Sequence, residues 1–214
     1  MSPAIPAVSA LYFDTAATTQ VAPQVVAAIV AQLNSADCYA NPSATSHQPG
    51  RAAAAVIAQA RTEIAAELGA EPDEVIFTSG ATEANNLALR GVALAHAAHG
   101  RHLVVSAIEH PAVLACCDAL QREGYMVTRV LPNRQGLIEP GAISQALRPD
   151  TLLISLMHIN NETGMIQPLT EVADLAAEAG VLFHVDAAQS AGKFNINLQQ
   201  LPIDMLASSA HKFH

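Results

Sequence analysis

Val181-Leu182-Phe183-His184-Val185-Asp186 is an apolar run that ends in a carboxylate, and it indicates the fold class more clearly than any other stretch of the chain. A short run of this kind is typical of a strand buried on both faces of a parallel sheet. The strand itself is predicted over residues 181–185. Five further runs have the same strand character and lie at residues 75–78, 103–106, 126–131, 152–157 and 205–207.

Helical patterns alternate with these strands, at residues 82–97, 111–123, 140–147 and 168–179. Prolines near the helix starts and Gly180 after one helix end support the boundaries. Alternation of strands and helices predicts parallel strands joined by crossover helices that cover both faces of the sheet. The predicted fold class is therefore α/β, with three layers (α/β/α) and a mostly parallel sheet.

The chain before residue 75 has a different pattern. Two helices are predicted, at residues 23–33 and 50–68, and a loop rich in Pro, Ser and Asn runs between them through residues 38–47. We find no internal repeat and no linker that would divide the chain. The 214 residues are enough for one domain with a sizeable core.

Composition narrows the class of protein. Hydrophobic residues make up 51% of the chain and charged residues 14%, which indicates a folded interior. The net charge of −9 argues against nucleic-acid binding. The three cysteines are too few and odd in number for a disulfide framework, which favours the cytoplasm. The apolar first ten residues lack the basic start of a secretory signal, and no apolar stretch reaches the roughly 20 residues of a membrane span.

A lysine and a carboxylate carry the main chemical hypothesis. Lys212 lies beside Ser and His in Ser208-Ser209-Ala210-His211-Lys212, and Asp186 ends a predicted strand. A lysine can form a Schiff base with the aldehyde of pyridoxal phosphate, and a carboxylate can keep the pyridine nitrogen of this cofactor protonated. An alternative is that Asp186 only caps the next turn. Lys193 is the other lysine of the chain, and we expect it to be solvated in its loop.

The stretch Ser79-Gly80-Ala81-Thr82-Glu83 joins a predicted strand to a predicted helix. Small residues such as Ala81 let backbone N–H groups approach an anion, and the helix N-terminus favours negative charge. Thr82 could donate a hydroxyl to a phosphate, although it could equally serve as a helix cap. Ser209 and His211 are candidates for holding the same phosphate as Thr82.

Three more side chains follow predicted strands. His110 begins a helix and could stack on a pyridine ring and relay protons, or could be structural. Asn161 offers an amide to the ring oxygen, unless it belongs to a polar turn closed by Gly164. Gln189 could donate to the same oxygen or could be a solvated loop amide. No metal site is predicted.

Taken in order, these residues make the chain resemble the cysteine desulfurases of the NifS/IscS type, within the class V aminotransferases. Each matching piece is a weak signal alone, but together and in the same order they are specific. The resemblance runs from residue 12 to the last residue and includes residues 12–19, 41–47, 80–86, 109–110, 158–164, 184–189 and 209–212.

The resemblance implies the type I fold of pyridoxal-phosphate enzymes. Residues 1–214 would form an N-terminal segment and most of the cofactor-binding large domain, without the C-terminal small domain. Lys212 would be the Schiff-base lysine and would act in catalysis with His110, which would stack on the ring. The resemblance further implies that Asp186 pairs with the pyridine nitrogen, that Asn161 and Gln189 contact the ring oxygen, that Ala81, Thr82, Ser209 and His211 bind the phosphate, and that Asn41 and Asn161 lie near the substrate.

The implied reaction converts L-cysteine to L-alanine and leaves a persulfide on an enzyme cysteine. The sulfur would then pass to an acceptor such as an iron–sulfur scaffold protein, or to thio-cofactor synthesis, and the enzyme would be a homodimer. In the family the attacking cysteine and the arginine that holds the substrate carboxylate lie beyond the position of His214. Cys38, Cys116 and Cys117 do not correspond to that cysteine, so we expect this chain to be inactive alone.

One further expectation follows from the resemblance. In the family an antiparallel strand after the lysine inserts between the first and last parallel strands, so these two strands would lack their shared partner here and the isolated chain would be unstable or would expose a gap. The other hypotheses are a different class V enzyme, such as a selenocysteine lyase or a kynureninase-like enzyme, and a non-catalytic remnant that binds the cofactor without turnover.

Overall fold

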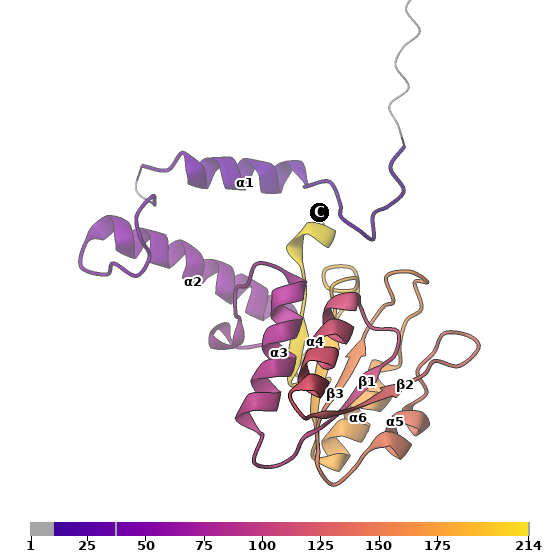
Figure 1. Ribbon diagram of the computed structural model, residues 1–214. Helices are drawn as coiled ribbons and strands as arrows, with labels where there is room; N and C mark the ends of the chain where they lie inside the picture. The colour runs from indigo at the N-terminus through magenta and orange to yellow at the C-terminus, as the bar shows by residue number, and fades with distance from the viewer. Residues whose placement is uncertain (1–10, 37, 214) are drawn as a thin grey trace, which may run out of the picture.

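Figure 1 shows the computed structural model of the chain, which describes residues 11–36 and 38–213. Its centre is a five-stranded sheet with the strand order β2-β1-β3-β4-β5. All four pairs of neighbouring strands are parallel, which confirms the sheet expected from the sequence. The strands are β1 (His102–Ser106), β2 (Met126–Val130), β3 (Thr151–Met157), β4 (Leu182–Asp186) and β5 (Met205–Ala207).

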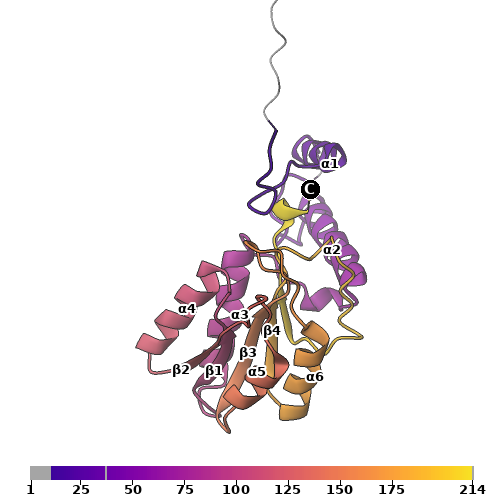
Figure 2. The same cartoon turned by 90° about the vertical axis from the view of Figure 1, so that its right-hand side faces the viewer.

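Two pairs of helices cover the two faces of this sheet (Figure 2). Helices α3 (Ala81–Ala95) and α4 (Pro111–Arg122) pack on one face, in a core that includes Leu89 and Leu103. Helices α5 (Pro140–Ala146) and α6 (Leu169–Ala179) pack on the other, around Phe183. The three layers predicted from the sequence are therefore confirmed.

Strands β1 and β3 are buried along their whole length, because each has a neighbouring strand on both sides and helices on both faces. Their side chains are mainly Leu, Val and Ile, which suit a strand buried on both faces. Buried apolar area is the dominant favourable term in folding, so these strands are the centre of the core. The sheet is thus the rigid part of the molecule on which the functional side chains are carried.

Helix α1 (Pro23–Leu33) lies away from this body in Figure 1 and in Figure 2. It has no buried residue, and α2 (Gln48–Leu68) buries only small side chains. Helix α2 ends at Gly69, whose φ of 70° is in the left-handed region that favours glycine at a helix end. A short 3-10 helix, η1 (Pro72–Glu74), follows it. Among the described residues, no helix is both long and apolar enough to cross a membrane.

The prediction of a strand at residues 75–78 is wrong. In the part of the chain that the structure describes, this segment is irregular and pairs with no strand. Phe77 is 50% exposed, and its ring lies 4.8 Å from the guanidinium carbon of Arg61. A strand needs a hydrogen-bonding neighbour, and the apolar pattern alone could not show that this neighbour is missing.

Parallel strands place their carboxyl ends at one edge of the sheet, and the register fixes which residues meet there. Met157, Asp186 and Ala207 are paired in register across β3, β4 and β5. Helix α3 begins at Ala81 near this edge, and the 3-10 helix η2 (Ala210–Lys212) follows β5. Ligands of open α/β sheets bind at such an edge, so the candidate site is expected there.

Candidate active site

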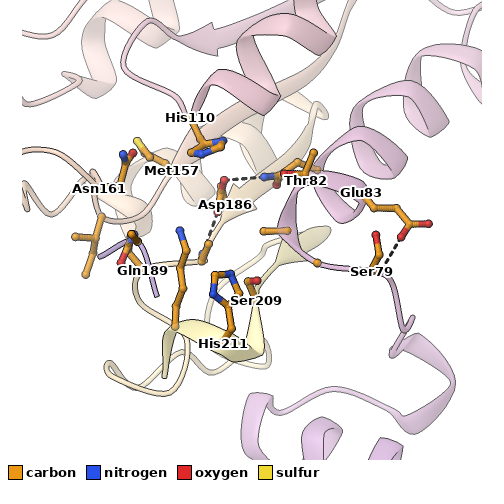
Figure 3. Close-up of a pocket in the computed structure, with 17 residues that line it drawn as sticks. Ser79, Thr82, Glu83, His110, Met157, Asn161, Asp186, Gln189, Ser209 and His211 are labelled. Carbon is orange, nitrogen blue, oxygen red and sulfur yellow. Dashed lines mark hydrogen bonds between the residues drawn. The ribbon is translucent and has the colours of Figure 1, made fainter. Parts of the chain in front are cut away.

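A pocket of about 350 Å³ lies at the carboxyl edge of the sheet, next to the N-termini of α3 and α4 (Figure 3). Segments that are far apart in the sequence contribute to its lining, from Ala17 near the start of the chain to Lys212 near its end. Nine of the ten residues predicted from the sequence line this pocket: Ala81, Thr82, His110, Asn161, Asp186, Gln189, Ser209, His211 and Lys212.

Asp186 is the buried acidic group of the pocket, with only 5% of its surface exposed. Its Oδ2 accepts a hydrogen bond of 2.7 Å from Nδ2 of Asn85, and its Oδ1 accepts one of 2.9 Å from the backbone N–H of Ala188. Both donors are neutral groups. A buried carboxylate with neutral donors favours a cationic partner on its open side, because neither bond neutralises its charge.

The N-terminus of α3 gives the pocket hydrogen-bond donors that suit an anion. Gly80 precedes α3 with a φ of 144°, a conformation that favours glycine and that turns the chain into the helix. The N-terminus of α3 presents the backbone N–H groups of its first turn together with the hydroxyl of Thr82. Ser209 faces this loop, since a Cβ placed on Gly80 would lie 3.7 Å from its Oγ.

Glu83 holds the approach to this helix in place. Its Oε2 accepts a hydrogen bond of 2.6 Å from the backbone N–H of Ser79. Hydrogen bonds from Ser79 lower the pKa of Glu83, so the side chain is held as a carboxylate. This contact fixes the turn between residue 79 and the first turn of α3, as a capping carboxylate does at other helix starts.

His110 caps the N-terminus of α4. Its Nδ1 accepts a hydrogen bond of 3.1 Å from the backbone N–H of Ala112. An Nδ1 that accepts a bond must be unprotonated, so the proton of the neutral ring lies on Nε2. Figure 3 shows the ring of His110 at the pocket, on the same side as Asp186.

The remaining wall of the pocket comes from η2 and from the N-terminal residues that lie against it. Lys212 is half-buried and His211 is exposed. The backbone carbonyl of His211 accepts a hydrogen bond of 2.9 Å from the N–H of Thr19. Lys193 does not line this pocket; it borders a shallower one together with Phe194. Lys212 is therefore the lysine of the candidate site.

The two amides assigned to the ring oxygen make protein contacts of their own. Nε2 of Gln189 donates to the backbone carbonyl of Ala16 over 2.7 Å. Nδ2 of Asn161 donates to Oε1 of Glu162 over 2.7 Å. Both residues border the main pocket and also the shallower one, so they lie where the two pockets meet.

Asn41 is the one candidate that the structure does not bring to either described pocket. It is exposed in the loop between α1 and α2, where its Oδ1 accepts a hydrogen bond of 2.9 Å from the backbone N–H of Ser43. Its contact with a substrate stays a prediction. The local bond explains the loop conformation, in which an Asn side chain mimics a backbone turn.

Two buried residues at the site were missed by the sequence analysis. Asn85 is 1% exposed and is the direct partner of Asp186. Its position one turn after Thr82 on the predicted helix was the signal that could have found it. Glu109 is also buried, and its Oε1 accepts a hydrogen bond of 2.6 Å from the backbone N–H of Met157.

The pKa of Glu109 is strongly shifted. Burial, more than any other cause, raises the pKa of Glu109 to about 8, and the charge of Asp186 acts in the same direction. At neutral pH the side chain is therefore mainly protonated. A protonated Glu109 places no charge of its own in this buried position.

The cysteines of the chain lie away from this pocket. Cys116 and Cys117 are buried on α4, and burial raises the pKa of Cys116 and raises that of Cys117 to about 12. A thiol with a raised pKa is a poor nucleophile at neutral pH. Cys38 is partly exposed in the loop after α1 and does not line the pocket. None of the three is placed to attack a ligand there.

The fold and the pocket together agree with one protein family. The chain belongs to the class-V aminotransferases, because the family model for aminotransferase class-V matches residues 11–214. This match covers the N-terminal segment, the whole sheet and the wall that contains Lys212.

Curated relatives of this chain are cysteine desulfurases. It is 43% identical over 204 residues to cysteine desulfurase IscS of Pectobacterium carotovorum subsp. carotovorum (strain PC1), which covers 95% of this chain and 50% of the relative. It is 45% identical over 202 residues to IscS of Pseudomonas syringae pv. tomato, covering 94% of this chain and 50% of the relative. The chain thus spans about half the length of these relatives.

Solved structures of similar sequence have the same fold as this chain. A structure described as SspA in complex with cysteine superposes with a TM-score of 0.89 at 43% identity, over 94% of this chain and 57% of that one. A NifS-like protein superposes with a TM-score of 0.91 at 35% identity, over 95% of this chain and 56% of that one. The α/β architecture of this chain is therefore that of the cysteine desulfurase structures.

Proposed function

We propose that this chain supplies the pyridoxal-phosphate-binding part of a cysteine desulfurase. The observation that carries the proposal is that Asp186, Lys212 and the N-terminus of α3 border a single pocket. The family and the cysteine desulfurase relatives support the same conclusion. We further propose that residues 1–214 correspond to the N-terminal segment and most of the large domain of the whole protein.

The donor set of the pocket fits this cofactor. Ala81, Thr82, Ser209 and His211 surround the end where the phosphate would be held by backbone N–H groups and hydroxyls. Asp186 would contact the pyridine nitrogen and His110 would stack on the ring. Asn161 and Gln189 would turn their amides toward the ring oxygen. The bound cofactor would supply an electron sink for the substrate α-carbon.

The side chains of this chain have definite tasks in such a reaction. Asp186 would hold the proton on the pyridine nitrogen, because at an effective dielectric of about 20 the attraction between two unit charges at contact is roughly 4 kcal/mol. Nζ of Lys212 would hold the cofactor covalently at rest and would accept the α-proton of the substrate once it is free. Nε2 of His110 carries a proton that can be given to a leaving group.

We infer that the substrate is L-cysteine, with Asn161 and Asn41 close to it, and that the products are L-alanine and a persulfide. The structure described as SspA in complex with cysteine, similar over 94% of this chain, supports this choice. A thiol and a carboxylate-binding arginine outside these residues would complete the reaction. The whole protein would act as a homodimer in the cytoplasm and would pass sulfur to an acceptor protein for iron–sulfur cluster assembly.

Cofactor binding is tested by adding pyridoxal phosphate to the protein and recording its visible absorption band. Reduction with borohydride followed by peptide mapping identifies the lysine that carries the cofactor. We expect the label on Lys212, and we expect Lys212→Ala to lose it while the matched variant Lys193→Ala keeps it. Label on Lys193, or on no lysine, would contradict the proposal. Release of sulfide from L-cysteine by the whole protein then tests the substrate.

A further inference from the structure

The N-terminal residues 16–19 lie against the pocket wall formed by η2, and we call them the strap. They are separated from their partners by more than 170 residues in the sequence. Ala16 accepts the hydrogen bond from Gln189, while Thr18 and Thr19 contact His211. The strap therefore touches two of the candidate cofactor-binding residues.

Thr19 donates two hydrogen bonds to the backbone carbonyl oxygen of His211. Its N–H donates to this oxygen over 2.9 Å, and its Oγ1 donates to the same oxygen over 3.0 Å. A carbonyl oxygen has two lone pairs, so these two donors occupy both. Any further donor to this oxygen is weaker and has to share a lone pair.

Thr18 faces the imidazole of the same residue. Its Oγ1 lies 3.0 Å from Nδ1 of His211 and 3.3 Å from the carbonyl oxygen that Thr19 already occupies. The hydroxyl has a single hydrogen. An unprotonated Nδ1 is the nearer acceptor and one that Thr19 does not use, whereas a protonated Nδ1 would donate to the hydroxyl and turn its hydrogen to the crowded carbonyl oxygen. The hydroxyl of Thr18 is therefore best directed at Nδ1.

We propose that Thr18 is a positioning residue that holds the neutral imidazole of His211 in the tautomer with its proton on Nε2. A ring that accepts a bond at Nδ1 carries its proton on Nε2, and the tautomer of a histidine is set by the bond that its other nitrogen makes. His211 lines the pocket, so it can donate Nε2–H to an anion without first becoming a cation. That the anion is a cofactor phosphate rests on the proposed function.

The tautomer can be measured directly and without cofactor. In the whole protein labelled with ¹⁵N-histidine, long-range proton–nitrogen spectra distinguish a protonated Nε2 from a protonated Nδ1, and the signals of His211 are identified by their loss in His211→Asn. We expect the Nε2–H form in the unmodified protein and in Thr18→Ser, which keeps the hydroxyl. Thr18→Val removes the hydroxyl and is expected to give a mixture of both forms.

The matched control is Thr62→Val, which removes an exposed hydroxyl that donates to a helix carbonyl on α2 and does not line the pocket. It should leave the spectrum of His211 unchanged. An Nδ1–H form in the unmodified protein would overturn the proposal, as would a tautomer that Thr18→Val does not alter. The first of these outcomes needs no variant, so the test stands even if a substitution prevents folding.

A second readout links the tautomer to the phosphate. Thr18→Val should weaken binding of pyridoxal phosphate by about three- to tenfold, the range expected for one hydrogen bond, with Thr18→Ser restoring it. Affinity that is equal in Thr18→Val and the unmodified protein would overturn the link. If no variant binds pyridoxal phosphate but the Nε2–H form is found, the proposed function fails while the assignment of Thr18 stands.

Discussion

The two walls of the pocket are built in different ways. The sheet-side wall, formed by Asn85 and Asp186 with Glu109 behind them, is buried, and its hydrogen bonds join neighbouring elements of the core. The strap-side wall, formed by the strap and by residues 209–212, is only partly buried and depends on bonds between the two ends of the described chain. The core fixes the first wall whether or not a ligand is present, whereas a few surface hydrogen bonds hold the second.

This difference separates stability from ligand binding. Substitutions in the sheet-side wall are expected to change both the free energy of unfolding and cofactor affinity, because they alter buried polar groups. Substitutions in the strap-side wall are expected to change cofactor binding alone. The four predictions below, from the largest effect to the smallest, test this separation.

The largest effect is expected for Asp186→Asn, which removes the charge of the sheet-side wall and keeps its shape. Loss of a contact worth roughly 4 kcal/mol at an effective dielectric of about 20 corresponds to about a thousandfold weaker binding of pyridoxal phosphate. Equilibrium titration of the absorption band measures the affinity. The exposed Asp174→Asn on α6 is the control. Affinity within about threefold of the unmodified protein would remove Asp186 from the site.

Glu109→Gln tests the protonated carboxyl of the same wall. Burial raises the pKa of Glu109 from 4.5 to about 8, so the folded protein keeps a proton that the unfolded chain loses above pH 4.5. This contribution to stability is full below pH 4.5 and is lost as the pH rises toward 8, by about 1.4 kcal/mol per pH unit. Denaturant melts between pH 5 and pH 8 should show this decline, and the variant should lack it.

The control for this measurement is Glu178→Gln, at an exposed position on α6. It should reproduce the decline of the unmodified protein. A decline that persists unchanged in Glu109→Gln would mean that another group causes it and that Glu109 is ionised in the folded state.

His184→Gln probes the core directly behind Asp186. Burial lowers the pKa of His184 from 6.5 to about 4, so the folded protein keeps a neutral ring that the unfolded chain protonates below pH 6.5. The stabilising contribution is present above pH 6.5 and is lost as the pH falls toward 4. The acid limb of unfolding should therefore be shallower in His184→Gln than in the exposed control His99→Gln. Acid limbs of equal slope in the two variants would contradict this prediction.

The smallest change in stability is expected for Lys212→Ala in the strap-side wall. This side chain is only half-buried, so its removal should alter the free energy of unfolding of the cofactor-free protein by no more than about 0.5 kcal/mol. Denaturant melts of the two proteins measure this. A loss above about 2 kcal/mol would show that the strap-side wall supports the core, and the separation between the two walls would disappear.

The sequence allowed much of the fold to be predicted. Strands with both faces buried have continuous apolar runs, whereas helices repeat their apolar residues once per turn. The run that ends at Asp186 is a strand in the structure, shifted by one residue to Leu182–Asp186. The segment at residues 75–78 is also an apolar run but has no neighbouring strand among those described, so its pattern gave the wrong prediction. Pairing is a property of the whole sheet and cannot be read from one segment.

The site could be predicted in part for a similar reason. Residues that follow strands gather at one edge of a parallel sheet, which brought His110, Asn161 and Asp186 to one pocket. Asn85 and Thr18 were missed, because their importance lies in contacts with residues 101 and 193 positions away. Asn41 does not line this pocket, and its expected place near the substrate stays a prediction.

The bond between Thr18 and His211 spans 193 positions, nearly the whole described chain. Closing a loop of this length costs conformational entropy, which a contact so distant in sequence has to offset. During synthesis, Thr18 must wait until residue 211 has left the ribosome, by which time β1 to β4 are already available to fold. We therefore expect the pocket to be completed only after β1 to β4 can fold.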